Sequence, residues 1–151
     1  MIPFGDPSAS YQAHKSQIDQ SIKRVLDSGW YVLGTEVDAF EEEFASFHGK
    51  DFHAVGVGNG TDAIALCPRG LGLGSGDEVI TPSHTAVATV AGIEQAGCTP
   101  VFADIDPNTR CISPMSIEER VSTNTRAIMP VHIYGQPAEM HKILRLHKPT
   151  T

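Results

Sequence analysis

A glycine-rich stretch in the first half of the chain has the residue types that bind an anion. It reads Gly56-Val57-Gly58-Asn59-Gly60-Thr61-Asp62-Ala63, follows an apolar run over residues 52–57, and opens a helical pattern. Glycines at a strand-to-helix turn let the backbone approach a bound group, and the first helical amides point at that group with about half a positive charge. The stretch therefore predicts a phosphate site, although the same residues could form only a tight connection.

Two common phosphate-binding motifs are excluded. A P-loop needs Gly-Lys-Ser/Thr after its spacer, and no lysine lies between Lys50 and Lys142. The dinucleotide fingerprint GxGxxG would need glycine at position 61, where the chain has Thr61. A phosphate without a lysine nearby fits a cofactor that is bound by amides and hydroxyls.

Several longer segments accompany this turn. They are Ser28-Gly29-Trp30-Tyr31 with Gly34, then Gly74-Ser75-Gly76-Asp77-Glu78-Val79-Ile80-Thr81-Pro82-Ser83-His84-Thr85, Val87-Ala88-Thr89, Gly97-Cys98-Thr99-Pro100-Val101-Phe102-Ala103-Asp104-Ile105-Asp106 and Pro130-Val131-His132-Ile133-Tyr134-Gly135-Gln136-Pro137. Together they resemble the sugar aminotransferases of the DegT/DnrJ/EryC1/StrS family, which are pyridoxal-phosphate enzymes of aminotransferase fold type I. The resemblance covers the whole chain, and its motifs are long, ordered and correctly spaced.

The resemblance implies a cofactor site. Gly60 and Thr61 match the pair that binds the phosphate of pyridoxal phosphate in the family, through backbone amides and the threonine hydroxyl. The alternative is that Thr61 only caps a helix. For Asp62 we favour a structural role, because a carboxylate in the first turn complements the helix dipole.

Position 86 departs from the family pattern. The family has a large aromatic residue there, whose ring stacks on the pyridine face of the cofactor, whereas this chain has Ala86. Stacked rings contribute about 0.5–1.5 kcal/mol beyond area burial, which a methyl group cannot replace. His84 is two residues away and would share a face with position 86 on a strand but not on a helix. From the sequence we do not assign His84 as a substitute.

Four further residues match the substrate side of the family site. Trp30 and Tyr31 resemble a segment near the substrate and the dimer contact, and they could equally form a hydrophobic plug between two helices. His132 and Tyr134 follow a predicted strand, where α/β folds bind ligands. They could bind a sugar hydroxyl or the cofactor, or they could be half-buried loop residues.

No residue is assigned a catalytic role. In the family an aspartate pairs with the pyridinium nitrogen and a lysine holds the aldehyde as a Schiff base, and both would lie after Thr151. None of the lysines present (Lys15, Lys23, Lys50, Lys142 and Lys148) has the family's Schiff-base context. The chain thus resembles the N-terminal part of such an enzyme, inactive by itself.

The resemblance also implies partners for the complete enzyme. It would be a homodimer that transfers an amino group from an amino acid to a nucleotide-linked keto-sugar. One alternative is a non-catalytic remnant that acts as an assembly or dimerisation partner through its N-terminal helices. Another is an unrelated nucleotide-binding α/β domain, which the two excluded motifs disfavour.

Composition excludes other classes. The net charge of −7 argues against nucleic acid as a partner, and no apolar run is long enough to span a membrane. Three widely spaced cysteines form neither a disulfide framework nor a metal motif, so we expect a cytoplasmic protein. We expect no metal site: His141 and His147 lie on different faces of a helix, and Asp104 and Asp106 precede a turn.

The pattern of elements predicts an α/β fold with a mostly parallel sheet and crossover helices, preceded by two helices. The first helix stops near Gly29, and the second is capped by Thr35 and ends at Gly49. Strands are expected at 53–57, 78–81, 99–103 and 126–131, and later helices at 61–67, 85–96, 114–121 and 138–146. Pro68 should end or kink the first of these helices. Residues 1–151 would form an incomplete large domain of a fold type I aminotransferase, with 1–50 as its N-terminal helical segment.

Overall fold

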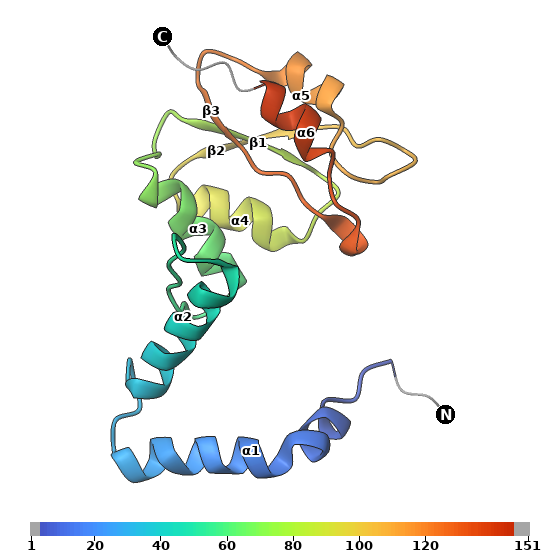
Figure 1. The fold of residues 1–151 in the computed structure, drawn as a ribbon. Helices are drawn as coiled ribbons and strands as arrows, with labels where there is room; N and C mark the ends of the chain where they lie inside the picture. The colour runs from blue at the N-terminus through green and yellow to red at the C-terminus, as the bar shows by residue number, and fades with distance from the viewer. Residues whose placement is uncertain (1–3, 147–151) are drawn as a thin grey trace. The chain divides into compact units, whose positions relative to one another are not determined.

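The computed structural model describes residues 4–146 and divides into two compact units at Gly56. Unit 1 is Met1–Gly56 and unit 2 is Val57–Thr151. The expected α/β class is confirmed, since unit 2 holds a parallel sheet with helices (Figure 1). Within residues 4–146, no helix combines the length and the apolar character needed to cross a membrane.

Unit 1 contains two helices, α1 (Pro7–Ser28) and α2 (Thr35–His48). Helix α1 begins where Asp6 accepts a hydrogen bond from the backbone N–H of Ala9, and it ends at Gly29, whose φ of 68° suits glycine. The predicted end near Gly29 is confirmed. The predicted cap of α2 is wrong: the cap is Gly34, and Thr35 is already the first helical residue.

The strand predicted at 53–57 is also wrong, because this segment has no regular structure. A strand needs a neighbour that accepts its backbone hydrogen bonds. The Gly56 N–H instead donates to a carboxylate oxygen of Glu41 on α2, at 2.6 Å. The apolar pattern of this segment identifies residues that favour extended backbone, but it does not supply the neighbouring strand.

Unit 2 is built on a sheet whose described strands are β1 (Glu78–Pro82), β2 (Thr99–Ala103) and β3 (Thr125–Ile128), in the order β2-β1-β3 and all parallel. Its helices are α3 (Gly60–Gly70), α4 (Val87–Gln95), α5 (Pro114–Arg120) and α6 (Met140–Ile143), with short 3₁₀ turns η1 (Ile133–Gly135) and η2 (Leu144–Leu146). The predicted strands at 78–81 and 99–103 are confirmed. The strand predicted at 126–131 is shorter than expected: β3 ends at Ile128.

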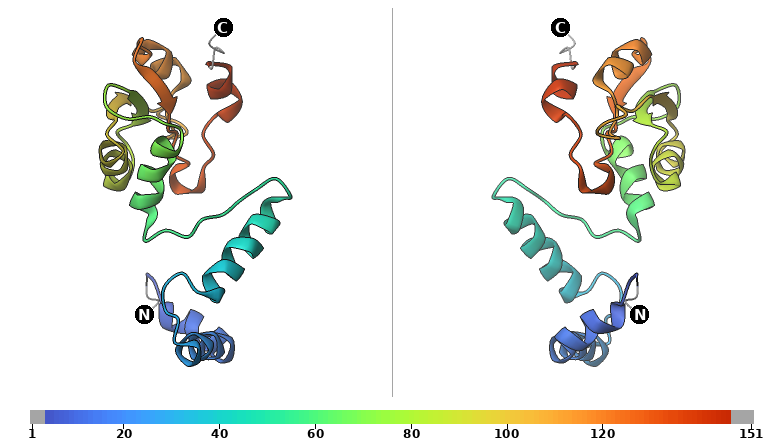
Figure 2. Two further views of the ribbon diagram at one scale, coloured as in Figure 1. Left: turned by 90° about the vertical axis from the view of Figure 1, so that its left-hand side faces the viewer. Right: turned by 90° about the vertical axis from the view of Figure 1, so that its right-hand side faces the viewer.

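Apolar side chains on the two faces of β1 organise separate cores. Val79 packs with Ile93 of α4 on one face. Ile80 packs with Ile117 of α5 and Ile143 of α6 on the other. The alternation follows from the twofold period of a strand. Figures 1 and 2 show α4, with α3 against it, on the opposite side of the sheet from α5 and α6.

Three helix predictions need correction. Helix α3 continues through the buried Pro68 to Gly70, because only two helical residues follow the proline and little of the helix depends on the bond that its missing N–H cannot make. Helix α4 begins at Val87 rather than at position 85. The helix expected at 138–146 is divided into α6 and η2.

The chain path makes a topological switch point at the carboxyl edge of the sheet. After β1 the chain crosses one face through α4, and after β3 it continues on the other face into α6. The carboxyl ends of the neighbouring strands β1 and β3 therefore lead to opposite faces. In open α/β sheets such a switch point is the usual ligand site.

Candidate functional site

The first turn of α3 presents backbone amides with no protein partner. Asn59 caps the helix, and its side-chain oxygen accepts a hydrogen bond from the Asp62 N–H at 2.9 Å. The first helical backbone bond runs from Ala63 N–H to the Asn59 carbonyl. Among residues 4–146, no hydrogen bond is formed by the amides of Gly60 and Thr61. Two donors and the positive end of an eleven-residue helix are thus open to an anion.

The side-chain position of Gly60 is open. A Cβ added there would have no heavy atom within 4 Å, and Gly60 is exposed. At Gly58, by contrast, a Cβ would lie 2.8 Å from a carboxylate oxygen of Asp62, which the Asn59 side-chain N–H₂ also contacts at 2.9 Å. Asp62 is therefore bound inside the turn, in keeping with the structural role expected for it.

Two aromatic side chains meet at the switch point of the sheet. His84 follows β1 and Tyr134 follows β3, and the Tyr134 hydroxyl lies 3.2 Å from His84 Nε2. Their rings meet edge to face, with centroids 5.8 Å apart and planes at 61°. Tyr134 has a φ of 55°, a left-handed conformation that is uncommon for a bulky residue. The local fold thus sustains an unfavourable backbone conformation where it contacts His84.

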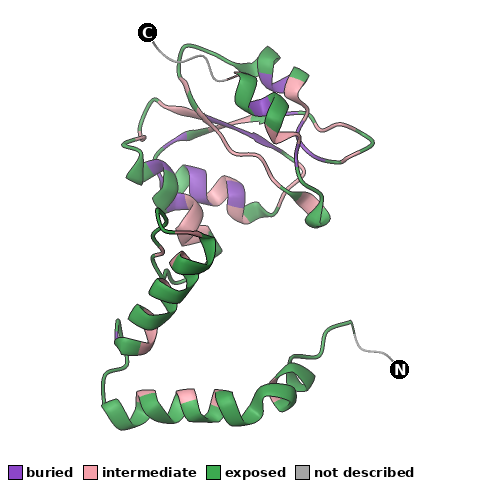
Figure 3. Ribbon diagram, in the orientation of Figure 1, coloured by how far each residue is buried: buried purple, intermediate pink, exposed green. Residues whose placement is uncertain are grey.

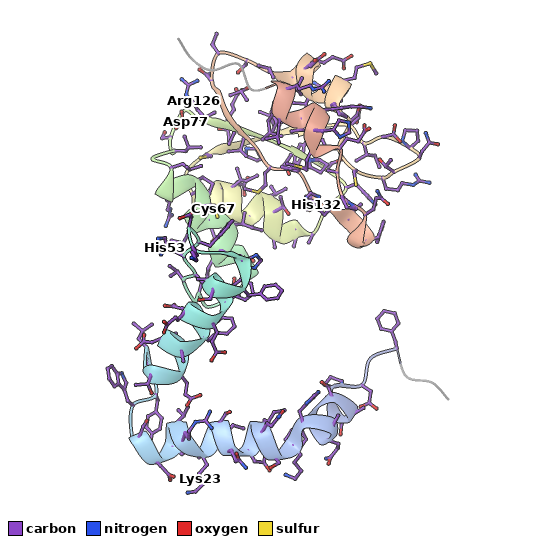
Figure 4. All side chains as sticks on the ribbon, viewed as in Figure 1. Lys23, His53, Cys67, Asp77, Arg126 and His132 are labelled. Carbon is purple, nitrogen blue, oxygen red and sulfur yellow. The ribbon has the colours of Figure 1, made fainter. Side chains whose placement is uncertain are left out.

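The loop after β3 is fastened by hydrogen bonds. His132 Nδ1 accepts from the Ala138 N–H at 3.0 Å, which closes residues 132–138 into a compact turn. The Thr81 hydroxyl donates to the Met129 carbonyl at 3.0 Å and joins the ends of β1 and β3. Figure 4 shows His132 on this loop. One nitrogen of His132 therefore has a structural partner, and its other nitrogen remains for a ligand.

Ala86 is the cap residue of α4 and is exposed. No side chain caps this helix, so its first amides also face the carboxyl edge. The loop before it is braced by a 2.8 Å hydrogen bond between the hydroxyls of Thr85 and Thr89. The site thus has free backbone donors, whereas position 86 offers only a methyl group.

Trp30 and Tyr31 lie in the connection between α1 and α2, in unit 1. The indole packs over Gly34, where an added Cβ would lie 3.5 Å from the Trp30 Cγ atom. Both rings are more than half exposed. Within unit 1, then, they do not form the buried plug that was the alternative interpretation.

Other polar groups have structural explanations. Backbone N–H groups of Thr109 and Asn108 donate to Asp106 and lower the pKa of its carboxyl, as expected for a turn. Asp77 and Arg126 pair at 3.5 Å at the amino edge, away from the candidate site (Figure 4). In the described part of the chain, no three His, Cys, Asp or Glu side chains gather as metal ligands. His147 lies outside the described residues.

The site contains two residues that the sequence analysis did not assign. Asn59 is the true cap of α3, and a capping preference for asparagine at that position is a signal that could have identified it. The contact between His84 and Tyr134 joins residues fifty positions apart, and no spacing rule predicts it.

Comparisons with known proteins agree on one family. The sequence profile of the DegT/DnrJ/EryC1/StrS aminotransferase family matches residues 12–150. The chain is 47% identical to the dTDP-3-amino-3,6-dideoxy-alpha-D-galactopyranose transaminase of Aneurinibacillus thermoaerophilus, covering 95% of this chain and 39% of that protein. It is 45% identical to the dTDP-3-amino-3,4,6-trideoxy-alpha-D-glucose transaminase of Streptomyces venezuelae, covering 96% and 38%.

Solved structures give the same result. The crystal structure of S. venezuelae DesV in complex with a ketimine intermediate matches with a TM-score of 0.91 and 45% identity, over 96% of this chain and 39% of that one. NtdA of Bacillus subtilis with bound PMP matches with a TM-score of 0.83 and 33% identity, over 89% and 31%. The chain thus spans about two fifths of the length of the relatives that it matches.

Proposed function

The chain belongs to the DegT/DnrJ/EryC1/StrS aminotransferase family, and we propose that it forms the phosphate-binding end and part of the substrate wall of a pyridoxal-phosphate site. The free amides of Gly60 and Thr61 at a helix N-terminus, next to an exposed glycine, carry this proposal. Amides and the Thr61 hydroxyl would bind the phosphate oxygens. When bound, pyridoxal phosphate supplies the electron sink for amino-group transfer.

The proposed substrate is a keto-sugar linked to a nucleotide, with an amino acid as amino donor. His132 and Tyr134 carry polar groups at the carboxyl edge, where they could bind sugar hydroxyls. Trp30 and Tyr31 supply exposed aromatic surface that suits a base or a sugar ring. We further propose that the complete enzyme is a homodimer. We also propose that it functions in a reducing cytosol, because all three cysteines are free thiols.

We also propose that these 151 residues alone catalyse no transamination. A lysine that forms a Schiff base must lose its proton, which a lowered pKa favours. Lys15 is paired with Asp19, and this hydrogen bond raises the pKa of the Lys15 amine. Lys23 and Lys142 are likewise paired, with Asp27 and Glu139.

One observation favours the alternative function as an assembly partner. Unit 1 exposes the aromatic residues Phe40, Phe44 and Phe47 along α2, beyond the exposed Trp30 and Tyr31. Such a surface suits a protein–protein contact. This alternative requires no cofactor and predicts self-association without any affinity for phosphate esters.

Incubation with pyridoxal phosphate and borohydride reduction of the intact chain separates the possibilities. We expect no single lysine to be modified stoichiometrically and no turnover of a keto-sugar nucleotide with glutamate. One stoichiometric modified lysine near Gly60 would contradict the view that this chain forms an incomplete site.

A further inference from the structure

The loop that follows β1 contains a side chain with no assigned role, His84. On the basis of the proposed function, we infer that His84 contacts the face of the cofactor's pyridine ring. It takes the place of the aromatic residue that Ala86 does not provide. Its ligand class is a flat heteroaromatic phosphate ester. Tyr134 is a positioning residue that fixes the imidazole through its hydroxyl.

The position of His84 supports this role. It lies in the connection from β1 to α4, on the β1 side of the switch point, two residues before Ala86. Helix α3 leads into β1, so the free amides at its beginning belong to the same edge of the sheet as His84. Helices α3 and α4 also pack closely, because a Cβ at Gly92 would lie 3.1 Å from the Thr61 carbonyl oxygen.

The orientation of the imidazole is fixed rather than free. The Tyr134 hydroxyl contacts Nε2, and the Tyr134 ring meets the imidazole edge to face. Tyr134 itself is 80% exposed, so burial of its ring does not explain its left-handed backbone. Strained residues cluster at ligand sites, where the surrounding structure holds them in place. Here the strain places a phenol against an imidazole at a ligand-binding edge.

The chemistry of the pair suits a pyridine ring. An imidazole offers a flat π face, and ring stacking contributes to affinity beyond the buried area. With Nε2 occupied by the phenol, Nδ1 remains available to donate or accept one hydrogen bond. His84 is half-buried, which leaves part of the side chain accessible to a ligand.

The test uses pyridoxamine 5′-phosphate, which has no aldehyde to react with lysines, and the intact chain. We expect cross-relaxation in NMR between the ring protons of His84 and the 2-methyl protons of the ligand. His84→Ala should weaken binding about three- to tenfold, the range expected for a lost stacking contact. His84→Ala combined with Ala86→Phe should recover that loss. Exposed His141 on α6 gives the matched control, so His141→Ala should leave affinity unchanged.

Tyr134→Phe separates positioning from folding. It keeps the ring and removes the hydroxyl, so the ¹⁵N shifts of the His84 ring should change while urea unfolding stays the same. The role of His84 would be overturned if His84→Ala bound the ligand with unchanged affinity, or if the ligand showed no cross-relaxation with the His84 ring. Either result would leave the proposed phosphate site in place. If inorganic phosphate and pyridoxamine phosphate both fail to bind the native chain, the proposed function itself fails.

Discussion

Unit 1 and unit 2 bury their apolar side chains to very different extents (Figure 3). Unit 2 has two cores, which together bury residues of β1, β2, α4, α5 and α6. Among the described residues of unit 1, only Gly34 is buried, although both helices carry apolar faces. The difference shows that a sequence can carry the full amphipathic pattern of a helix where its own unit does not bury the apolar face.

The helices of unit 1 rely on local contacts. Asp6 caps α1, and side-chain pairs four residues apart join Lys15 to Asp19 and Lys23 to Asp27. Exposed pairs of this kind contribute little, because water and salt screen them. Most helical stability in proteins comes from packing of an apolar face. Within unit 1, little packing is therefore available to stabilise the two helices.

The largest expected effect comes from comparing a core substitution in unit 2 with a substitution in unit 1. Ile80→Ala removes a fully buried side chain between the sheet and α5, and should lower the free energy of unfolding by about 2–5 kcal/mol. Phe44→Ala in unit 1 removes a larger but half-exposed ring, and should cost much less. Urea unfolding of both variants measures the difference. Equal losses would show that unit 1 has a core of its own.

A second prediction concerns association. The exposed aromatic residues of α2 should make the chain self-associate despite its net charge of −7. Replacing Phe44 and Phe47 by glutamine should lower the average mass seen by light scattering. Met115→Gln provides the control, because Met115 is exposed on α5 in unit 2. A native chain that is already a monodisperse monomer would remove the argument that unit 1 needs a cover.

Hydrogen exchange sharpens this prediction at β3. This strand is at one edge of the described sheet, beside a groove of about 700 Å³ lined by residues that include Ile128, Pro130 and Leu146. Amides at 128–131 should exchange faster than those of the central strand β1. Strong protection of residues 128–131 in a monomer would mean that unit 2 closes its own edge.

A third prediction concerns the cap of α3. Asn59→Ala removes the bond to the Asp62 N–H and should cost about 1 kcal/mol in urea unfolding. Asn59→Ser retains a capping oxygen and should recover most of it. Loss of more than about 2 kcal/mol would place Asn59 in a larger network than this turn.

The smallest expected effect is the salt dependence of the pKa values of two carboxyl groups, one in each unit. A hydrogen bond from Arg24 lowers the pKa of Glu36 in unit 1, and backbone hydrogen bonds lower that of Asp106 in unit 2. Both contributions to stability are present above the unfolded-state pKa and are lost as pH falls through the lowered folded-state pKa. Added salt should raise the Glu36 pKa and leave that of Asp106 nearly unchanged, because amides carry no net charge. Carboxyl ¹³C titrations at two salt concentrations measure this, and equal responses would contradict the assignment.

Sequence patterns were sufficient where local signals and tertiary contacts agree. Strand β2 was predicted with its observed bounds, since glycine precedes it and aspartates follow it. The segment at 53–57 has the same apolar character but no neighbouring strand, so the prediction failed there. The glycine-rich composition indicated the start of α3, but the expected strand-to-helix turn was wrong in part, because Gly60 and Thr61 are already helical and residues 53–57 form no strand. The contact of His84 with Tyr134 was not predicted, because it depends on which strands are neighbours.

The most direct test of the central claim is a phosphate titration of the intact chain, followed by the amide resonances of α3. The account predicts saturable shifts that are largest at Gly60 and Thr61. Thr61→Val should weaken binding, and the unrelated threonine variant Thr123→Val should not. Shifts that spread over many surface amides without saturating, or none at Gly60 and Thr61, would contradict a phosphate site at this helix.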